Sequence, residues 1–295
     1  MTRFVKRKRH CCGLRAFSKD LQTLISQLQA AGIDNPRREL TLLIAFLQNR
    51  SYTDVFFEPA ISGEDFDRLV PLVQRRCNNE PLSKIIGQRE FWSLPFKVTA
   101  DTLDPRPDSE TLIQAVLEHF PDHDIPLTII DFGTGTGCLF LSLLSEYPNS
   151  LGVGVDISDA ALAVAQQNAG RLGLDQRASF IKGNWAEGMQ GTFDVLISNP
   201  PYIGLNDLLE DSVKQYDPHQ ALYAGEDGLA AYRALLPQLP ALMHPYSLAF
   251  LEIGLGQGDT VRWVAKQAGL VFLATYPDLS GIERVVVFGK SGPGH

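Results

Sequence analysis

The sequence predicts an α/β protein in which a doubly wound parallel sheet follows a small bundle of helices. Two observations support this prediction. From residue 127 onward, short apolar runs alternate with helical segments, which is the pattern of strand–helix–strand units in a parallel sheet. Before residue 80, the apolar residues instead recur at helical spacing. The two parts of the chain are therefore expected to fold as separate domains.

The first predicted domain, residues 18–80, is a bundle of amphipathic helices. Ser18 is a suitable cap for the first helix, and Asn35-Pro36 begins the second with a cap and a proline in the first turn. A third helix follows Ser62, but Pro71 within it requires either a kink or a later start. No chemistry is visible in this bundle, and a role in substrate docking or packing is expected.

Residues 81–107 are predicted to link the two domains, with some strand character. The link ends in a proline-rich stretch in which Arg106 stands between two prolines. A hinge accounts for the prolines but less well for Arg106, which we assign to substrate binding. Asp108 or Ser109 can then cap the first helix of the second domain, residues 108–290. A short tail, residues 291–295, completes the chain.

The second domain alternates strands and helices from its first strand to its last. Ser158 is a suitable cap for its longest helix and Gly173 a suitable end. The apolar runs predicted to be strands are 127–132, 151–157, 178–182, 193–198, 248–253, 270–275 and 283–288. Three helices are predicted between them: one that follows Gly137, one over residues 158–172 and one over residues 257–268.

Composition narrows the class of protein. The 295 residues carry a formal net charge of −8, with 44% hydrophobic and 20% charged residues, which is typical of a soluble protein and argues against a general nucleic-acid binder. No apolar run reaches membrane-spanning length. The four cysteines show neither metal-binding nor disulfide spacing, so no metal is expected and a reducing cytoplasm is the expected location.

The N-terminal tail, residues 1–17, is basic although the chain as a whole is acidic. We expect this tail to be disordered; contact with nucleic acid or a ribosome is the alternative.

A glycine-rich loop joins the first strand of the second domain to its helix. Its glycines allow positive φ and a close approach of the backbone to a ligand. The dinucleotide fingerprint would require glycine at position 138, where the chain has Cys138. The carboxylate of Asp131 would repel a pyrophosphate but attract an ammonium group. The loop therefore favours S-adenosylmethionine over NAD, and the residues assigned to the cofactor are Asp131, Gly133, Thr134, Gly135, Thr136 and Gly137.

Three later positions extend the predicted cofactor site. Asp156 lies about twenty residues beyond the loop, at the end of the second strand, and is placed to accept both ribose hydroxyls. Asn184 and Trp185 follow the third strand and would flank an adenine by hydrogen bonding and stacking. The alternative for Trp185 is a packing role.

The sequence Asn199-Pro200-Pro201-Tyr202 follows a fourth apolar strand and is the predicted catalytic and substrate-binding segment. The two prolines end the strand and hold the carbonyls rigidly, as free acceptors. A planar –NH2 group would give one hydrogen to the Asn199 side-chain oxygen and the other to the Pro200 carbonyl, with the Tyr202 ring against its face. Asn199 would also border the cofactor. The alternative is a simple turn.

These segments together resemble the release-factor glutamine N5-methyltransferases, the HemK/PrmC family, from about Arg37 to Phe288. The motifs that carry the resemblance are Pro105-Arg106-Pro107-Asp108-Ser109-Glu110, the Gly133–Gly137 loop, Asp156, Asn168-Ala169 with Arg171-Leu172-Gly173, Asn199-Pro200-Pro201-Tyr202, Asp217-Pro218 with Ala221-Leu222, Gly225-Glu226-Asp227-Gly228-Leu229 and Leu251-Glu252-Ile253-Gly254.

The resemblance implies a helical domain that helps to receive the substrate and a seven-stranded, Rossmann-like methyltransferase domain. It implies methyl transfer from S-adenosylmethionine, leaving S-adenosylhomocysteine, to the glutamine of the Gly-Gly-Gln loop of peptide chain release factors. A monomer is expected. The alternatives are a ribosomal-protein glutamine, an exocyclic amino group of nucleic acid, and a non-catalytic binding module. The acidic balance of the chain counts against the nucleic-acid substrate.

Overall fold

The structure is a computed structural model that describes residues 18–209 and 211–291. The chain divides into two compact units, Met1–Ile86 and Gly87–His295. The predicted N-terminal tail and residues 292–295 of the predicted C-terminal tail lie outside the described residues.

The first unit is a bundle of helices, as predicted. Ser18 Oγ accepts a hydrogen bond from the Leu21 amide (3.3 Å), and Ser62 Oγ accepts one from the Asp65 amide (3.0 Å), so both serines cap their helices. The helix that follows Ser62 begins at Gly63 and continues through Pro71, which excludes a later start. Two short helices that were not predicted complete the unit. Its elements are α1 (Lys19–Ala30), α2 (Pro36–Gln48), α3 (Tyr52–Phe57), α4 (Gly63–Cys77) and α5 (Leu82–Ile86).

The division between the two units falls inside the predicted linker, residues 81–107. Helix α5 belongs to the first unit, whereas an antiparallel hairpin, β1 (Gln88–Phe91) and β2 (Leu94–Lys97), belongs to the second. The buried Asn168 side chain holds this hairpin. Its Oδ1 accepts a hydrogen bond from the Lys97 amide (2.7 Å) and its Nδ2 donates to the Lys97 carbonyl (3.1 Å). The hairpin is therefore a fixed part of the second unit.

The second unit is built on a seven-stranded sheet with the strand order β5-β4-β3-β6-β7-β9-β8. The first five strands in sequence run parallel, but β9 is antiparallel to both of its neighbours. The predicted doubly wound parallel sheet is therefore confirmed, with an antiparallel strand near one edge. Only a short turn separates β8 from β9, and a connection of that length pairs strands antiparallel. The strands are β3 (Thr128–Phe132), β4 (Leu151–Asp156), β5 (Ala178–Lys182), β6 (Phe193–Ser198), β7 (Met243–Glu252), β8 (Leu270–Pro277) and β9 (Glu283–Lys290).

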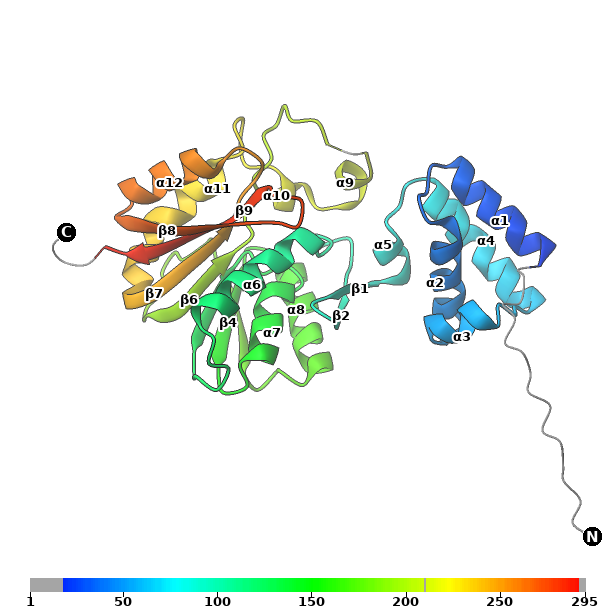
Figure 1. The fold of residues 1–295 in the computed structure, drawn as a ribbon, viewed down its shortest axis with the longest axis horizontal. Helices are drawn as coiled ribbons and strands as arrows, with labels where there is room; N and C mark the ends of the chain where they lie inside the picture. Colours follow the sequence, from blue (N-terminus) through cyan, green and yellow to red (C-terminus); the bar gives the residue numbers. More distant parts are fainter. Residues whose placement is uncertain (1–17, 210, 292–295) are drawn as a thin grey trace, which may run out of the picture. The chain divides into compact units, whose positions relative to one another are not determined.

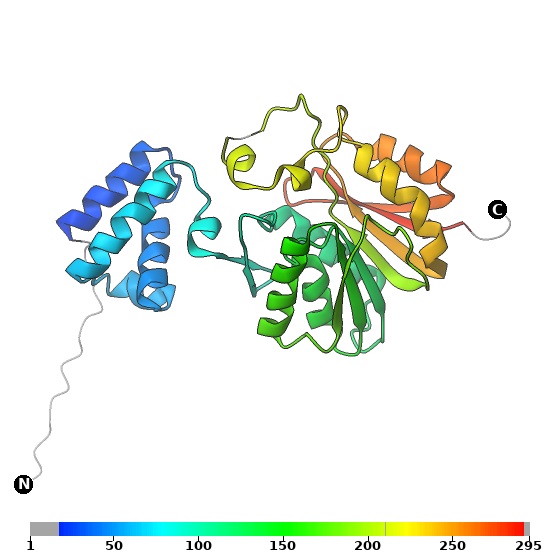
Figure 2. The ribbon, with the colours of Figure 1, turned by 180° about the vertical axis from the view of Figure 1, so that it is seen from behind.

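Helices cover both faces of this sheet, which confirms the doubly wound architecture (Figures 1 and 2). On one face, α6 (Glu110–His119), α7 (Cys138–Glu146) and α8 (Asp159–Leu172) share an apolar core with the strands. On the other, α11 (Ala230–Leu235), the 3-10 helix η2 (Leu236–Leu242) and α12 (Gly258–Gln267) form a second core. The amide of Gly173 bonds back to the last turn of α8, and this residue adopts the left-handed conformation that ends the helix.

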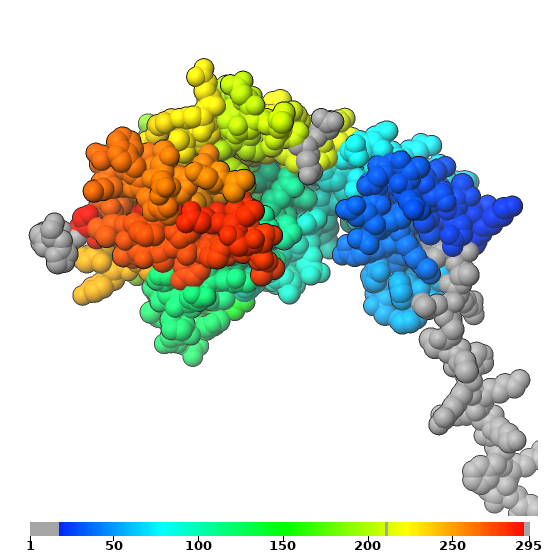
Figure 3. All heavy atoms as spheres, turned by 45° about the horizontal axis from the view of Figure 1, so that its top comes forward, coloured from blue at the N-terminus to red at the C-terminus, as the bar shows by residue number. Residues whose placement is uncertain are grey.

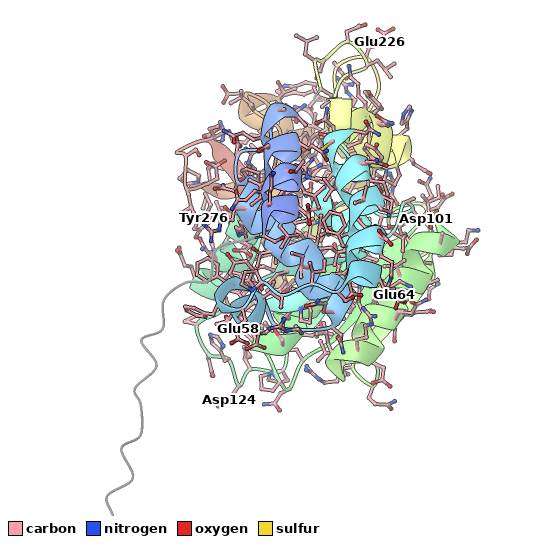
Figure 4. The ribbon with its side chains drawn as sticks, turned by 90° about the vertical axis from the view of Figure 1, so that its right-hand side faces the viewer. Glu58, Glu64, Asp101, Asp124, Glu226 and Tyr276 are labelled. Atoms are coloured by element: carbon pink, nitrogen blue, oxygen red, sulfur yellow. The ribbon has the colours of Figure 1, made fainter. Side chains whose placement is uncertain are left out.

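A long segment between β6 and α11 lies at the surface of the second unit, in yellow-green in Figure 3. It carries two short helices, α9 (Asp211–Tyr216) and α10 (His219–Leu222). Backbone hydrogen bonds tie its start to its end, from the Ile203 amide to Leu222 (3.1 Å) and from the Ala224 amide to Ile203 (2.9 Å). Glu226 stands at the outer end of the loop that follows α10 (Figure 4).

Candidate active site

The register of four neighbouring strands brings the predicted site residues to one edge of the sheet. Phe132 of β3 pairs with Val155 of β4 and with Ser198 of β6, and Ser198 also pairs with Leu251 of β7. The residues directly after Phe132, Val155, Ser198 and Leu251 are Gly133, Asp156, Asn199 and Glu252, respectively. This is the carboxyl edge of the parallel strands, where ligands bind in open α/β sheets.

The glycine loop turns sharply over the end of β4. The amides of Gly133 and Thr134 both donate to the Val155 carbonyl, at 2.8 and 2.9 Å. Gly133, Gly135 and Gly137 all have a positive φ, between 55° and 79°, a backbone conformation that residues other than glycine rarely adopt. The Gly135 amide donates to Asp156 Oδ2 (2.9 Å), so the carboxylate predicted to bind a ribose also fixes the loop.

Asp131 lies beneath this loop and is only 1% exposed. Thr134 Oγ1 donates to its Oδ2 (2.7 Å), whereas its Oδ1 has no hydrogen-bond partner among the described residues. Burial raises the pKa of the Asp131 carboxyl to about 7; the Thr134 hydrogen bond opposes this rise, and the nearby charge of Asp156 adds to it. The structure thus leaves one buried carboxyl oxygen available for a cation.

A cavity of about 400 Å³ opens beside the loop. Gly133, Gly135 and Asp156 border it on one side, and Asn184 and Trp185 on another. Trp185 has a φ of 56°, a strained conformation for an aromatic residue, and such strain gathers at functional sites. Its ring lies next to the backbone of Gly133. Trp185 thus borders the cavity and also packs against the second apolar core, so its role at the cofactor stays a prediction.

A second cavity, of about 710 Å³, lies on the far side of the Asn-Pro-Pro-Tyr segment. Arg106, Pro200, Tyr202 and Glu252 are among the residues that border it. Leu103, Asn199, Pro201 and Ala221 border both cavities. Asn199 therefore stands between two adjoining hollows, as expected of a residue placed between a group donor and its acceptor.

The Asn199 amide is held by a residue distant in sequence. Its Nδ2 donates to Ser109 Oγ (3.1 Å), and Ser109 is 2% exposed. Ser109 does occupy the N-terminal position of α6, as predicted, but its side chain makes no capping hydrogen bond. Asp108 lies instead in a short 3-10 turn, η1 (Pro107–Ser109), and its carboxylate is 3.3 Å from the Arg284 guanidinium.

Glu252 is a buried carboxyl in the second cavity. Its side chain accepts a hydrogen bond from the Tyr202 hydroxyl (3.4 Å), and its backbone carbonyl accepts one from the Tyr232 hydroxyl (2.8 Å). Burial raises the pKa of Glu252 to about 7, although Ser109, Arg284 and Tyr202 each favour its ionised form. Burial and the charge of Glu252 also raise the pKa of Tyr202 well above its ordinary value, so this phenol stays protonated.

Comparison with known proteins supports what this geometry indicates. The profile of the PrmC N-terminal domain matches residues 21–87, and that of the methyltransferase small domain matches residues 105–214. A release factor glutamine methyltransferase of Rhodospirillum rubrum is 40% identical over 91% of this chain and 83% of its own length. That of Caulobacter vibrioides is 38% identical over 90% of this chain and 93% of its own length. This chain belongs to the release factor glutamine methyltransferase family.

Membership of this family confirms the resemblance found in the sequence and identifies the chain as an S-adenosylmethionine-dependent methyltransferase. Among solved structures, a methyltransferase from Pyrococcus furiosus has the same fold, with a TM-score of 0.50 at 16% identity over 74% of this chain and 98% of its own. This likeness concerns the fold alone.

The first cavity of this methyltransferase suits S-adenosylmethionine in its chemistry. Asp156 would accept hydrogen bonds from the ribose hydroxyls, and Trp185 would lie against the adenine. Asp131, the predicted partner of the ammonium group, lies beneath the loop and has a free carboxyl oxygen, but it is not on the border of the cavity. Of the predicted cofactor residues, Gly133, Gly135, Asp156, Asn184, Trp185 and Asn199 border this cavity. Asp131, Thr134, Thr136 and Gly137 do not border it. Their contacts are to the loop itself: Thr136 Oγ1 accepts from the Cys138 amide (3.3 Å) and the Thr136 carbonyl from Asn168 (2.9 Å).

Sequence reasoning missed the site roles of Ser109, Asp217 and Glu252 in this methyltransferase. Ser109 was considered as a cap and as part of a family motif, and the other two only as parts of family motifs. The available signal was a single carboxylate, Glu252, directly after an apolar strand, which is where parallel strands present ligand-binding residues. Burial raises the pKa of the Cys138 thiol to about 12, so it is a packing group rather than a nucleophile.

Two features of other classes of protein are absent from the described residues, 18–209 and 211–291. No group of three or more His, Cys, Asp or Glu side chains among them is arranged to hold a metal ion. None of the helices they form combines the length and apolar character needed to span a membrane.

Proposed function

We propose that this protein transfers a methyl group from S-adenosylmethionine to the side-chain amide nitrogen, N5, of the glutamine in the Gly-Gly-Gln motif of peptide chain release factors. The observation that carries this proposal is the position of Asn199 between the two cavities, with its amide nitrogen tied to Ser109. Because the –NH2 end is tied, the Oδ1 end is the one left to accept a hydrogen from a substrate amide.

An amide nitrogen is a poor nucleophile because its lone pair is delocalised into the carbonyl, so the site must position it well. Asn199 Oδ1 and the Pro200 carbonyl would accept its two hydrogens, and Pro201 would keep that carbonyl rigid. The bound S-adenosylmethionine supplies an electrophilic methyl group from the first cavity. Positioning of two reactants contributes roughly 7–11 kcal/mol to such a step.

The same two acceptors would favour the transition state over the ground state. Positive charge develops on the substrate nitrogen as the new bond forms, which strengthens its hydrogen bonds to Asn199 and Pro200. The Tyr202 hydroxyl is directed to Glu252, which leaves its ring to lie against the flat face of the substrate amide.

The borders of the second cavity favour a protein substrate. Leu208 and Leu255 border it and are 97% and 77% exposed, as suits contact with another protein. Its charged residues are three acidic side chains and one arginine, a poor match for nucleic acid. Arg106, assigned to substrate binding, is that arginine. The proposed substrate, a translation factor, fits a cytoplasmic enzyme.

The test is to incubate the protein with labelled S-adenosylmethionine and, separately, a release factor, ribosomal proteins or nucleic acid. We expect the label on the glutamine of the Gly-Gly-Gln motif, located by mass spectrometry of the digested release factor. Label on either other substrate, with an unmodified release factor, would contradict the proposal.

The variant Asn199→Ala tests the proposed role of this residue. We expect kcat to fall by about two to three orders of magnitude, the range seen when one transition-state hydrogen-bonding group is removed. The matched control is Asn149→Ala, which removes an exposed asparagine that bonds only the Asp124 carbonyl (2.9 Å) and should leave kcat unchanged. Near-normal turnover of Asn199→Ala would remove Asn199 from the mechanism.

A further inference from the structure

The side chain of Gln257 lies where three segments of the second unit meet. Its Oε1 accepts a hydrogen bond from the Gly254 amide (3.0 Å), and its Nε2 donates to the carbonyls of Tyr202 (2.9 Å) and Gly228 (3.4 Å). Tyr202 ends the Asn-Pro-Pro-Tyr segment, Gly228 lies in the loop that follows α10, and Gly254 follows β7. One carboxamide thus joins three separate pieces of backbone beside the second cavity, which Gln257 borders.

All three contacts agree with a single orientation of the Gln257 carboxamide. Its oxygen only accepts and its –NH2 group only donates, while a backbone N–H group donates and a backbone carbonyl accepts. Exchange of the two ends would place the oxygen against two carbonyls and the –NH2 group against an N–H group. The backbone partners therefore fix the orientation of Gln257, and both of its N–H groups are already used.

Two glycines leave no spare room around these contacts. A Cβ added at Gly228 would overlap the Tyr202 carbonyl and lie 2.8 Å from Gln257 Nε2. One added at Gly254 would lie 2.8 Å from Gln257 Oε1 and 3.0 Å from Tyr202 Cδ2. The three segments approach Gln257 this closely because neither glycine carries a side chain, and a contact packed without voids transmits displacements.

The contacts of Gln257 hold the far end of the segment that carries the proposed substrate acceptors. The near end is held by β6, where Ser198 pairs with Phe132 and its Oγ donates to the Phe132 carbonyl (2.7 Å). Pro200 and Pro201 lie between these two ends, and proline fixes φ. The position of the Pro200 carbonyl therefore depends on both ends, and Gln257 helps to hold the second.

The peptide unit between Tyr202 and Ile203 is held on both of its sides. Its carbonyl accepts from Gln257, and its N–H group donates to the Leu222 carbonyl (3.1 Å). A peptide unit is planar, so hydrogen bonds to its two opposite sides fix its rotation, whereas one alone leaves it free to tilt. Loss of the Gln257 donor would therefore change the direction in which the two prolines enter this unit.

We propose that Gln257 is a positioning residue for methyl transfer, which holds the Tyr202 backbone so that the Pro200 carbonyl and the Tyr202 ring keep their places beside the substrate amide. This inference rests on the proposed function of the Asn-Pro-Pro-Tyr segment. Gln257 does not need to touch the reacting atoms, because its effect passes through the backbone of Tyr202.

The first test is the kinetics of Gln257→Met, which keeps the length of the side chain and removes all three hydrogen bonds. With both substrates saturating, we expect kcat to fall about tenfold, because a misplacement of about 1 Å can cost about a hundredfold and a tilt is a smaller displacement. The KM of the release factor should stay within about threefold, as for a residue that matters in the transition state. A normal kcat, or a loss that appears wholly in KM, would overturn the proposal.

Saturating S-adenosylmethionine is needed in this assay because of the loop that contains Gly228. Ala224 and Gly225, at the start of this loop, border the first cavity, and the Ala224 carbonyl accepts from the Ala230 amide (3.1 Å). A change in the affinity for S-adenosylmethionine would then not enter kcat.

The matched control is Gln238→Met. Gln238 lies in η2, borders neither cavity, and its Nε2 donates to the Ala234 carbonyl four residues earlier (2.7 Å). This substitution also removes a hydrogen bond from a glutamine to a backbone carbonyl, but kcat should keep its wild-type value. An equal loss of kcat in Gln238→Met would show that the effect does not depend on the contact with Tyr202, and would overturn the proposal.

Gln257→Asn tests the same role in a variant that keeps the carboxamide. Its side chain is shorter by one methylene group, so it cannot reach the Gly254 amide and the Tyr202 carbonyl together. We expect kcat to fall while the KM of the release factor again changes little, and this variant decides the matter should Gln257→Met fail to fold. Wild-type kcat in Gln257→Asn would contradict the proposal.

A readout independent of turnover separates this proposal from the proposed function. In protein labelled with fluorotyrosine, the fluorine resonance of Tyr202 is identified by its loss in Tyr202→Phe. We expect this resonance to shift or broaden in Gln257→Met and to stay unchanged in Gln238→Met. If the wild type fails to methylate a release factor yet the resonance responds in this way, the function is wrong and the hold of Gln257 on Tyr202 stands. A resonance that is unchanged in Gln257→Met refutes that hold.

Discussion

The Arg106 guanidinium donates to the Asp217 carboxylate at 2.7 Å, across 111 positions of the chain. The Asp217 side chain is 2% exposed, whereas that of Arg106 is 37% exposed. Asp217 also accepts a hydrogen bond from the Asp104 amide (3.3 Å), so it ties the residues on both sides of Pro105 to the segment between α9 and α10. Arg106, assigned to substrate binding from its place between prolines, thus borders the second cavity in a position that Asp217 fixes.

We expect Arg106→Ala to lower the free energy of unfolding by about 2 kcal/mol, because it removes a cation that lies 2.7 Å from a buried carboxylate. This value lies below the full cost of breaking a buried pair since Arg106 is partly exposed. The matched control is Arg233→Ala, whose partner Asp227 is 49% exposed and whose own side chain is 53% exposed. That exposed pair is screened by water, so its loss should change the free energy of unfolding far less. If urea denaturation gives equal losses of unfolding free energy for the two variants, other contacts of Asp217 replace the one with Arg106.

Asp156 should be essential for binding S-adenosylmethionine. Its two oxygens already accept the Gly135 and Ser158 amides, each at 2.9 Å, which aims the remaining lone pairs at the first cavity. Hydrogen bonds to a charged group contribute about 1.5–3 kcal/mol, so Asp156→Ala should weaken binding by roughly 10- to 100-fold in calorimetry. Asp159→Asn, which neutralises an exposed carboxylate in the first turn of α8, is the control and should bind normally.

The sequence predicted the strands and the glycine loop well because both depend on local chemistry. Residues 178–182 and 193–198 coincide with β5 and β6, since each is an apolar run with polar boundaries. The predicted start of the fifth strand at residue 248 was late, because Pro245 interrupts a strand that begins at Met243. The register shift between β6 and β7 accommodates this irregular start.

The links between distant residues were not predictable from local patterns. Ser109 and Asn199 are 90 positions apart, and Glu252 approaches them only because β7 lies next to β6. The antiparallel β9 likewise depends on a turn in which Asp278 Oδ1 accepts the Ser280 and Ile282 amides. Strand order and register are tertiary properties, and they decide which side chains share a site.

Binding of S-adenosylmethionine should depend on pH through Asp131. Its pKa is about 7 in the free protein because of burial, and only the ionised form attracts an ammonium group. Below that pH, binding must first remove a proton, so affinity should fall by up to about tenfold per pH unit as the pH decreases, and should level off above the pKa. Calorimetry at about pH 6, in two buffers of different ionisation enthalpy, should report release of about one proton per ligand. Asp131→Asn should abolish the proton release, and release that persists in this variant would exclude Asp131 as its source.

The contact between β4 and α7 should tolerate no side chain at Gly152. A Cβ added there would overlap the Phe140 ring and lie 2.8 Å from the Ile129 carbonyl oxygen. Phe140 is fully buried in the core beneath the sheet, so neither neighbour has room to move. We expect Gly152→Ala to reduce the free energy of unfolding by at least about 1–3 kcal/mol, the usual cost of overpacking.

Gly170 provides the matched comparison for this prediction. It lies inside α8, has an ordinary helical φ, and an added Cβ would meet nothing within 4 Å. Gly170→Ala should therefore raise the free energy of unfolding by about 0.4–1 kcal/mol, because alanine loses less backbone entropy on folding. Thermal and urea denaturation of the two variants should thus move in opposite directions from wild type. If both variants raise the free energy of unfolding, the packing argument for Gly152 is wrong; if both lower it, the entropy argument for Gly170 is wrong.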